Sequence, residues 1–310
     1  MMDVKKDLFL EIFHSIDFWK IKDHPNILIA AAFWEKERFQ AAKVCYQSMR
    51  VIDDLIDNYK AEHQSIHPGD REQFKASVNT WLSLFISSSD KTGFQKELTE
   101  TFEKFRIPLW TMQAFAKSMI YDIDHEGFPT FGTYLEYSQG ASVAPASVFV
   151  HLAGLTRQGD QYKAPAFDLK ESSTPCAIFS YLVHIIRDFQ KDQLNHLNYF
   201  PEDLMLKNGL SLQDLRKFAG GEPVNEPFRN LIREMYERAD EYRLKTFQVI
   251  ERISPFMEPR YRLSLEIIFS LYTMIFEKID PEKGQFTATE LNATPEETRE
   301  RVFKIIQQSA

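Results

Sequence analysis

The stretch RVIDDLIDNYK, Arg50–Lys60, decides how the rest of the chain is interpreted. It ends a run of apolar residues spaced by three and four, which predicts a helix with one buried face. On such a helix Asp53 and Asp57 lie one turn apart on the same side, with Asp54 beside them and Arg50 one turn earlier. Like charges at this spacing repel each other unless a cation lies between them, and Mg²⁺ and Mn²⁺ accept carboxylate oxygens. Taken alone, the stretch fits a metal site and a solvated acidic helix end equally well.

A second stretch repeats the pattern far downstream and favours the metal site. Ala177–Asp192, AIFSYLVHIIRDFQKD, is an apolar helix that ends in Asp188 and Asp192, again four residues apart. Arg187 adjoins Asp188, and His184 lies one turn earlier. Two apolar helices that each end in an aspartate pair beside an arginine could face each other across a cavity. Such a cavity could bind diphosphates through metal ions.

Composition narrows the function classes. With 310 residues, 44% of them hydrophobic, the chain can bury a large core in one domain. The net charge of −8 argues against a nucleic-acid partner, because binding its phosphates needs a concentrated basic face. The glycines form neither a dinucleotide-binding nor a phosphate-binding loop motif. Cys45 and Cys176 fall in or beside apolar helical runs and are interpreted as core thiols.

Targeting and membrane-spanning segments are not expected. The N-terminal stretch MMDVKKDLFLEIF has acidic residues among its apolar ones and lacks a cleavage-like site, so it is not interpreted as a signal peptide. The longest weakly polar stretch, Ala141–Leu155, is too short to span a bilayer. We therefore expect a soluble, cytoplasmic protein.

Helical periodicity runs through nearly the whole chain, and almost no segment shows the alternation of a strand. An all-α fold in a single domain over residues 1–310 is therefore expected. The one long connection, Thr156–Ser173, is polar and is interpreted as a surface loop or a lid. Turn-forming residues separate the predicted helices, which are 3–20, 26–58, 69–88, 91–105, 108–125, 130–154, 172–196, 211–219, 226–253, 258–280 and 295–308.

From about residue 26 to 280 the chain resembles the squalene/phytoene synthase family, the head-to-head trans-prenyltransferases. AKVCYQSMRVIDDLID resembles the family's YAF-x-R-x-x-DD-x-x-D helix, with Tyr46 and Arg50 in register beside the three aspartates. FRIPLWTMQAFAKSMIYDI, residues 105–123, is similar to its F-x-IP and GM-x-x-DL stretch. FGTYLEYSQGAS resembles its Y-C-x-x-x-AG helix, with Tyr134 and Gly140 matching.

The resemblance continues through the second acidic stretch. RDFQKDQLNHLNYFPEDL, residues 187–204, aligns without a gap on the family's RD-x-x-x-D and YLP-x-D segment. Tyr272 matches a tyrosine near the last core helix. These ordered matches imply an isoprenoid-synthase-like helical bundle around a large apolar pocket.

The implied reaction condenses two farnesyl or geranylgeranyl diphosphates head to head through a cyclopropyl diphosphate. The product would be a squalene- or phytoene-type hydrocarbon of terpenoid or carotenoid biosynthesis. The resemblance implies Mg²⁺ as cofactor, with Mn²⁺ as the alternative, and NADPH if the product is squalene. It also implies prenyl diphosphates as the partners, and at most peripheral membrane contact for release of the apolar product.

The resemblance further implies a set of site residues. Metal ligands would be Asp53, Asp57, His184, Asp188 and Asp192. Catalytic residues would be Asp53, Asp57, Asp188, Asp192 and Tyr134. Substrate-binding residues would be Tyr46, Arg50, Asp54, Gly140, His184, Arg187 and Tyr272.

Several positions depart from the family pattern. The family usually has Asn at the position of His184, Gln at Tyr181 and Arg at Leu197. Because these positions concern pocket walls and phosphate contacts, prenyl chain length and product stay open.

A catalytically altered or inactive member that binds a lipid or a protein partner is the alternative. A di-iron carboxylate bundle fails, because it needs two ExxH motifs and the chain has one, Glu11–His14.

Overall fold

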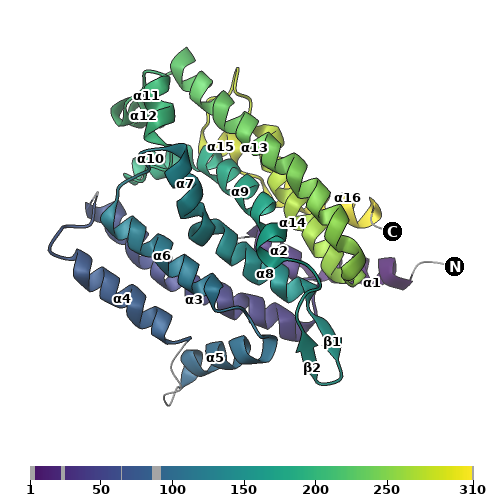
Figure 1. Ribbon diagram of the computed structural model, residues 1–310. Coiled ribbons are helices and arrows are strands. Elements are labelled where there is room, and N and C mark those ends of the chain that lie inside the picture. The colour runs from purple at the N-terminus through teal and green to yellow at the C-terminus, as the bar shows by residue number, and fades with distance from the viewer. Residues whose placement is uncertain (1–3, 22–24, 64, 86–91, 309–310) are drawn as a thin grey trace.

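Helices account for nearly all of the secondary structure, which confirms the predicted all-α fold. The computed structural model describes residues 4–21, 25–63, 65–85 and 92–308 (Figure 1). The helices of the first half are α1 (Val4–Ser15), α2 (Pro25–Ala31), α3 (Lys36–His63), α4 (Arg71–Ser83), α5 (Gly93–Phe105), α6 (Trp110–Asp124), α7 (Phe131–Ser138), the π-helical turn η1 (Gln139–Val143) and α8 (Ala144–Gly154). Those of the second half are α9 (Leu169–Arg187), α10 (Phe189–Leu194), α11 (Glu202–Lys207), α12 (Leu212–Ala219), α13 (Glu226–Ile253), the 3₁₀ turn η2 (Ser254–Phe256), α14 (Pro259–Lys278), α15 (Ala288–Leu291) and α16 (Pro295–Gln308).

Three predicted helices are interrupted. The helix predicted over 26–58 is two helices, because α2 ends at Ala31 and the chain turns through buried aromatic residues before α3 begins. The helix predicted over 172–196 begins earlier, where Asp168 caps the Glu171 amide, and it breaks at Asp188 between α9 and α10. The segment predicted over 130–154 is helical throughout but contains the wider turn η1.

A physical cause for that wider turn lies at its end. Pro145 is within the first two residues of α8 and has no amide hydrogen to donate to the preceding turn. The Ala144 amide donates to the Gln139 carbonyl, five residues back, which is the π-helical pattern. The helix therefore changes phase between α7 and α8.

The connection predicted as a surface loop or lid forms a short hairpin. β1 (Thr156–Gln158) pairs antiparallel with β2 (Gln161–Lys163). The Tyr162 hydroxyl donates to a Glu37 oxygen of α3 at 2.9 Å, and its ring stacks on Phe105 of α5 with the ring centroids 4.9 Å apart. These contacts fix the hairpin to the outside of α3 and α5. No residue from 156 to 171 lines the cavity described below.

The helices form layers around a central pair. Figure 1 shows α3 to α6 on one side, α13 and α14 on the other, and α8 and α9 between them. The residue contacts agree, since α8 packs on α3, α6 and α9, and α13 runs along α9. Helix α1 packs on α16, which brings the two ends of the described chain together (Figure 1). The apolar faces of all these layers meet in one buried core.

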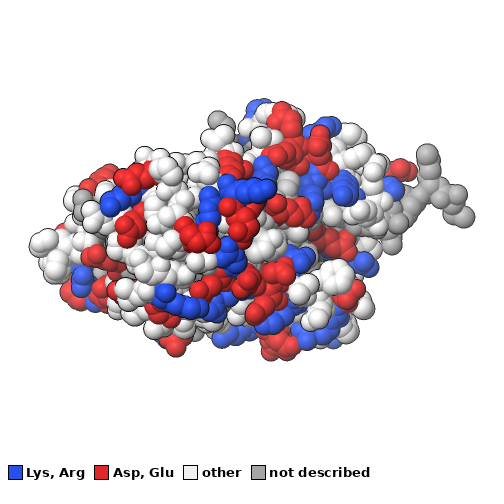
Figure 2. All heavy atoms as spheres, turned by 90° about the horizontal axis from the view of Figure 1, so that it is seen from above, with Lys and Arg blue, Asp and Glu red and all other residues white. Residues whose placement is uncertain are grey.

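The surface mixes charges of both signs. In Figure 2 acidic and basic side chains alternate over the visible face, and the described residues form no broad basic area there. Among the described helices, none combines the length and the apolar character that crossing a bilayer requires.

Candidate active site

A large cavity of about 900 Å³ lies between the layers. It is bounded by α2 and α3 on one side, by η1, α8, α9 and α10 in the middle, and by α13 and α14 on the other. Its apolar lining includes Phe18, Ile27, Ile29, Met49, Phe115, Ala146, Phe149, Val150, Ile185, Val249, Ile250, Ile253, Leu265 and Ile268. The apolar pocket implied by the resemblance is therefore present.

Both acidic stretches line this cavity. Asp53 and Asp57 reach it from the middle of α3, and Asp188 and Asp192 reach it from the break between α9 and α10. The two aspartates of each pair are four residues apart in sequence, which places their carboxylates one helical turn apart, as predicted. Segments separated by more than a hundred residues thus present four carboxylates to one space.

Each aspartate pair has one arginine bound to it. Arg50 is hydrogen-bonded to both Asp53 and Asp54. Arg187 donates from Nε to Oδ1 of Asp188 at 2.7 Å and from a terminal nitrogen to Oδ2 at 2.6 Å. The second arrangement is bidentate, which is the stronger form of arginine–carboxylate pairing.

The pKa values show that the four carboxylates are not equally neutralised. Burial raises the pKa of Asp53 to about 6 despite the adjacent Arg50. Burial and the negative charge of Asp53 raise the pKa of Asp57 well above its ordinary value. Burial and the charge of Asp188 raise the pKa of Asp192 to about 7. Burial also acts on Asp188, but the Arg187 hydrogen bonds outweigh it and hold its pKa below the ordinary value.

These carboxylates suit a divalent cation that is shared with a substrate phosphate better than a cation that only protein side chains surround. Among the residues that the structure describes, no three His, Cys, Asp or Glu side chains converge into a complete metal site. Mg²⁺ commonly takes one or two carboxylates and completes its shell with water and substrate phosphate. Three half-buried carboxylates with raised pKa values are groups whose ionised form a nearby cation would stabilise. The donor set therefore fits Mg²⁺ or Mn²⁺.

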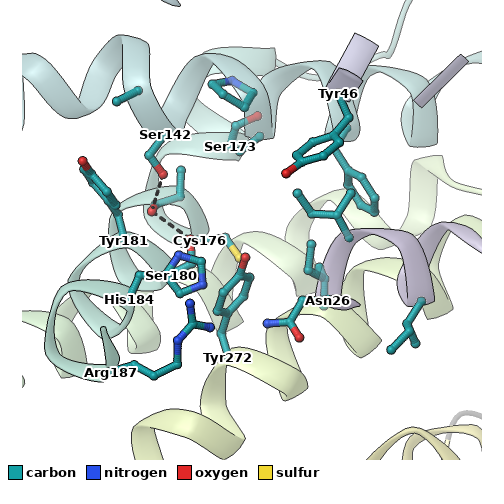
Figure 3. A pocket seen from close by; sticks show the side chains of 18 of the residues that line it. Asn26, Tyr46, Ser142, Ser173, Cys176, Ser180, Tyr181, His184, Arg187 and Tyr272 are labelled. Carbon is teal, nitrogen blue, oxygen red and sulfur yellow. Dashed lines mark hydrogen bonds between the residues drawn. The ribbon is translucent and has the colours of Figure 1, made fainter. Parts of the chain in front are cut away.

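His184 lies beside the second aspartate pair. Its ring packs edge-on against Tyr272 of α14, with the ring centroids 5.1 Å apart. Figure 3 shows His184, Arg187 and Tyr272 next to one another, with Asn26 of α2 on the other side of Tyr272. Burial raises the pKa of Tyr272 to about 12, so its hydroxyl stays protonated at neutral pH.

Tyr46 also lines the cavity, as predicted. Three other predicted site residues, Asp54, Gly140 and Tyr134, lie outside the cavity lining. Asp54 has a side chain that is 47% exposed and pairs with Arg50. At Gly140 an added Cβ would lie 2.0 Å from the Ala114 carbonyl oxygen, so this glycine permits close packing of η1 on α6. Tyr134 is fully buried.

Tyr137, one turn after Tyr134, lines the cavity in its place. The Tyr134 ring instead stacks behind Tyr181, with the ring centroids 5.5 Å apart. Both tyrosines lie on one side of α7, so spacing alone did not distinguish them. Sequence reasoning passed over Tyr137 because the resemblance placed Tyr134 in the motif.

Tyr137 belongs to a polar group that was not predicted. Its hydroxyl donates to Oδ2 of Asp122 on α6. The ammonium of Lys60, near the end of α3, lies 3.5 Å from Oδ1 of the same carboxylate. Asp122 is the penultimate residue of the 105–123 stretch, but nothing in the sequence marked Lys60 as its partner.

The three positions that depart from the family pattern differ in their surroundings. Tyr181, like His184, lines the cavity, where its ring lies 6.4 Å from Tyr137 and 6.3 Å from Tyr199, centroid to centroid. Leu197 lies instead against a small separate pocket behind Asp122. Tyrosine at 181 therefore adds an aromatic ring to the cavity wall.

Comparison with known sequences identifies relatives of this chain. The sequence profile described as squalene/phytoene synthase matches residues 22–299. The chloroplastic phytoene synthase of Narcissus pseudonarcissus is 22% identical over 244 residues, which cover 79% of this chain and 54% of that protein. The phytoene synthase of an Oncidium hybrid cultivar is also 22% identical, over 79% of this chain and 55% of that protein. The chain thus spans about half the length of these curated relatives.

Solved structures share the fold at low sequence identity. A dehydrosqualene synthase crystal structure superposes with a TM-score of 0.70 at 15% identity, covering 97% of this chain and 98% of that one. The squalene synthase HpnC from Alicyclobacillus acidocaldarius gives 0.65 at 14% identity, covering 89% and 94%. YisP from Bacillus subtilis gives 0.63 at 14% identity, covering 98% and 100%. With a profile match over nearly its whole length, this chain belongs to the squalene/phytoene synthase family.

Proposed function

We propose that this protein condenses two prenyl diphosphates head to head, as a prenyltransferase of the squalene/phytoene synthase type. The observation that carries the proposal is the placement of both aspartate pairs on one apolar cavity of about 900 Å³. An acidic rim suits metal-bound diphosphates, and an apolar interior suits prenyl chains. The family membership supports the same reaction class.

The charged rim would bind the diphosphate groups. Arg50 lies beside Asp53 within α3, Arg187 lies at the end of α9, and Lys191 lines the cavity beside Asp192. Their positive charges would hold a diphosphate and stabilise it as a leaving group. Mg²⁺ or Mn²⁺, held by Asp53 and Asp57 on one side and by Asp188, Asp192 and His184 on the other, would neutralise the remaining negative charge.

The reaction begins when the C–O bond of one substrate breaks and diphosphate leaves with the electron pair. The double bond of the second substrate attacks the allyl cation, and loss of a proton closes a cyclopropane. Loss of the second diphosphate then opens the ring to the linear carbon skeleton. A final proton loss would give a phytoene-type product, whereas NADPH, if bound, would supply the hydride for a squalene-type product.

The cavity wall would protect these cations. Phe115, Tyr137 and Tyr181 offer aromatic rings, which attract cations through their π faces. The apolar lining excludes the water that would trap a carbocation as an alcohol. Trp19, which lines the cavity while 52% exposed, marks an apolar edge at which peripheral membrane contact could assist product release.

Product analysis tests the proposal. The purified protein is incubated with Mg²⁺ and farnesyl or geranylgeranyl diphosphate, with and without NADPH, and the apolar extract is analysed by mass spectrometry. The proposal predicts a C30 or C40 hydrocarbon, and a dependence on NADPH would assign a squalene-type product. Absence of any hydrocarbon from both substrates, with Mg²⁺ and with Mn²⁺, would contradict it and favour the lipid- or partner-binding alternative.

A further inference from the structure

We infer that Lys60 is a positioning residue for the proposed reaction, because it holds the Asp122 carboxylate that orients Tyr137 at the cavity. The inference rests on the proposed function, since Tyr137 faces reacting groups only if the cavity binds prenyl diphosphates. Neither Lys60 nor Asp122 lines the main cavity. They would act on the reaction only through Tyr137.

The contacts form a continuous chain from α3 to the cavity. The Lys60 side chain is 8% exposed, and its ammonium donates to the His125 carbonyl oxygen at 3.1 Å. It also lies 3.5 Å from Oδ1 of Asp122, whose side chain is 13% exposed. The other oxygen of that carboxylate accepts the Tyr137 hydroxyl. One carboxylate therefore links the lysine to the tyrosine.

Charge explains why a lysine is needed there. Asp122 is close enough to Asp53 and Asp57 to raise the pKa of both, so this region holds three half-buried carboxylates. A buried carboxylate is strongly unfavourable unless a cation accompanies it. Arg50 is bound to its own aspartates, and Lys60 supplies the positive charge next to Asp122.

The hydrogen bond has a direction that matters for the cavity. An ionised carboxylate can only accept, so the Tyr137 hydroxyl must donate to it. The lone pairs of the phenol oxygen are then left for the cavity, where they can face a developing cation. Without Lys60 to hold it, the carboxylate could turn away, and Tyr137 would lose both its partner and its fixed orientation.

Lys60 and Asp122 line a second, smaller cavity, which is separate from the proposed substrate site. It measures about 20 Å³ and is lined by Lys60, Asp122, His196 and Tyr199, among others. That volume accommodates about one water molecule among polar partners. Lys60 and Asp122 thus contact a small polar space behind the active site and no prenyl chain.

The test compares turnover of Lys60→Met with that of Lys43→Met, a matched change at an exposed lysine of the same helix. We expect kcat of Lys60→Met to fall about 10- to 100-fold with KM little changed, because orientation and not substrate binding is lost. Lys60→Arg keeps the charge and should recover most of the rate, and Lys43→Met should match the wild type. Melting curves establish that each variant is folded. Lys60→Gln, which keeps a donor without the charge, replaces Lys60→Met if that variant does not fold.

A double-mutant cycle separates positioning from general stability. If Lys60 acts through Tyr137, adding Lys60→Met to Tyr137→Phe should lower kcat no further. The role of Lys60 is overturned if Lys60→Met lowers kcat as much in the Tyr137→Phe background as in the wild type. It is also overturned if folded Lys60→Met has an unchanged kcat. In either case an active wild type still supports the proposed function. A wild type inactive on both prenyl diphosphates would overturn the proposed function and this role together.

Discussion

Arg187 clamps Asp188 with two parallel hydrogen bonds of 2.7 and 2.6 Å, whereas Asp192, one turn away, keeps a pKa near 7. The two members of this pair therefore differ in charge near neutral pH. Asp188 is ionised and fixed in place, and a cation that offsets the burial of Asp192 and the charge of Asp188 would favour the ionised form of Asp192. Metal binding and proton loss should accordingly be linked at this site.

The aspartates that line the cavity should be needed for turnover. Asp53→Asn and Asp188→Asn each remove one anionic ligand, which should lower kcat about 10²- to 10⁴-fold, or roughly 3–5 kcal/mol. Asp54→Asn is the matched control, because Asp54 lies next to Asp53 but outside the cavity lining, and its loss should be much smaller. Steady-state kinetics and melting curves measure both effects. Normal rates in the first two variants would exclude the metal-site assignment.

In the absence of metal, Asp192 should contribute less to the free energy of unfolding as pH rises. Because the folded pKa of Asp192 is about 7 and its ordinary value is 3.8, the folded state holds this proton more tightly than the unfolded state. The contribution of Asp192 to the free energy of unfolding therefore decreases between about pH 4 and pH 7 and stays low above that. In a melting-temperature series over this range, Asp192→Asn should show a flatter pH dependence than the wild type. Parallel curves for the two proteins would mean that Asp192 titrates normally.

Metal and substrate should stabilise the fold jointly. Mg²⁺ together with a non-hydrolysable farnesyl diphosphate analogue should raise the melting temperature more than the two separate shifts combined. Saturating analogue should add about 2–4 kcal/mol to the free energy of unfolding. Differential scanning fluorimetry provides the measurement, and Asp188→Asn serves as the control that should lose the joint shift. Purely additive shifts for farnesyl and geranylgeranyl analogues would argue for binding without a shared metal.

His184 should set the metal preference. Imidazole suits Mn²⁺ better than Mg²⁺, so His184→Asn, which restores the usual family residue, should retain turnover and move the preference towards Mg²⁺. The ratio of the rates with Mn²⁺ and Mg²⁺ measures this directly. An identical ratio in the wild type and the variant would show that His184 is not a ligand. Its contact with Tyr272 would then be its main role.

The two neighbouring tyrosines should respond differently to loss of their hydroxyl groups. Tyr137→Phe removes a hydroxyl bound to Asp122 at the cavity and should lower kcat, whereas Tyr134→Phe changes a buried ring behind the wall. We expect near-normal turnover for Tyr134→Phe. The reverse order of rates would favour Tyr134 over Tyr137 as the catalytic tyrosine of the site.

The sequence predicted the all-α fold and the meeting of the two acidic helices, because both follow from regular helical spacing. The aspartate pairs and their arginines lie four residues or fewer apart, so one helical turn fixes their relative positions. The sequence did not predict where the helix is irregular. The turn η1 follows α7, and which of Tyr134 and Tyr137 lines the cavity depends on how α7 packs against α6 and α9.

Other features depend on contacts between distant segments. Lys60 and Asp122 are 62 residues apart, and no periodicity connects a lysine at the end of one helix to an aspartate on another. The tight contact of Gly140 with Ala114 likewise depends on how closely η1 approaches α6. Such pairings follow from tertiary packing, which local sequence patterns do not encode.

The stoichiometry of diphosphate release distinguishes head-to-head condensation from hydrolysis of the substrate. With Mg²⁺ and the active prenyl diphosphate, both inorganic diphosphate and apolar product are quantified from the same reaction, and Asp188→Asn is run as the control. Head-to-head condensation predicts two diphosphates and one hydrocarbon of doubled carbon number for every two substrate molecules, and a strong decrease of both products in Asp188→Asn. Diphosphate or phosphate released with only the prenyl alcohol, and no hydrocarbon, would contradict the account.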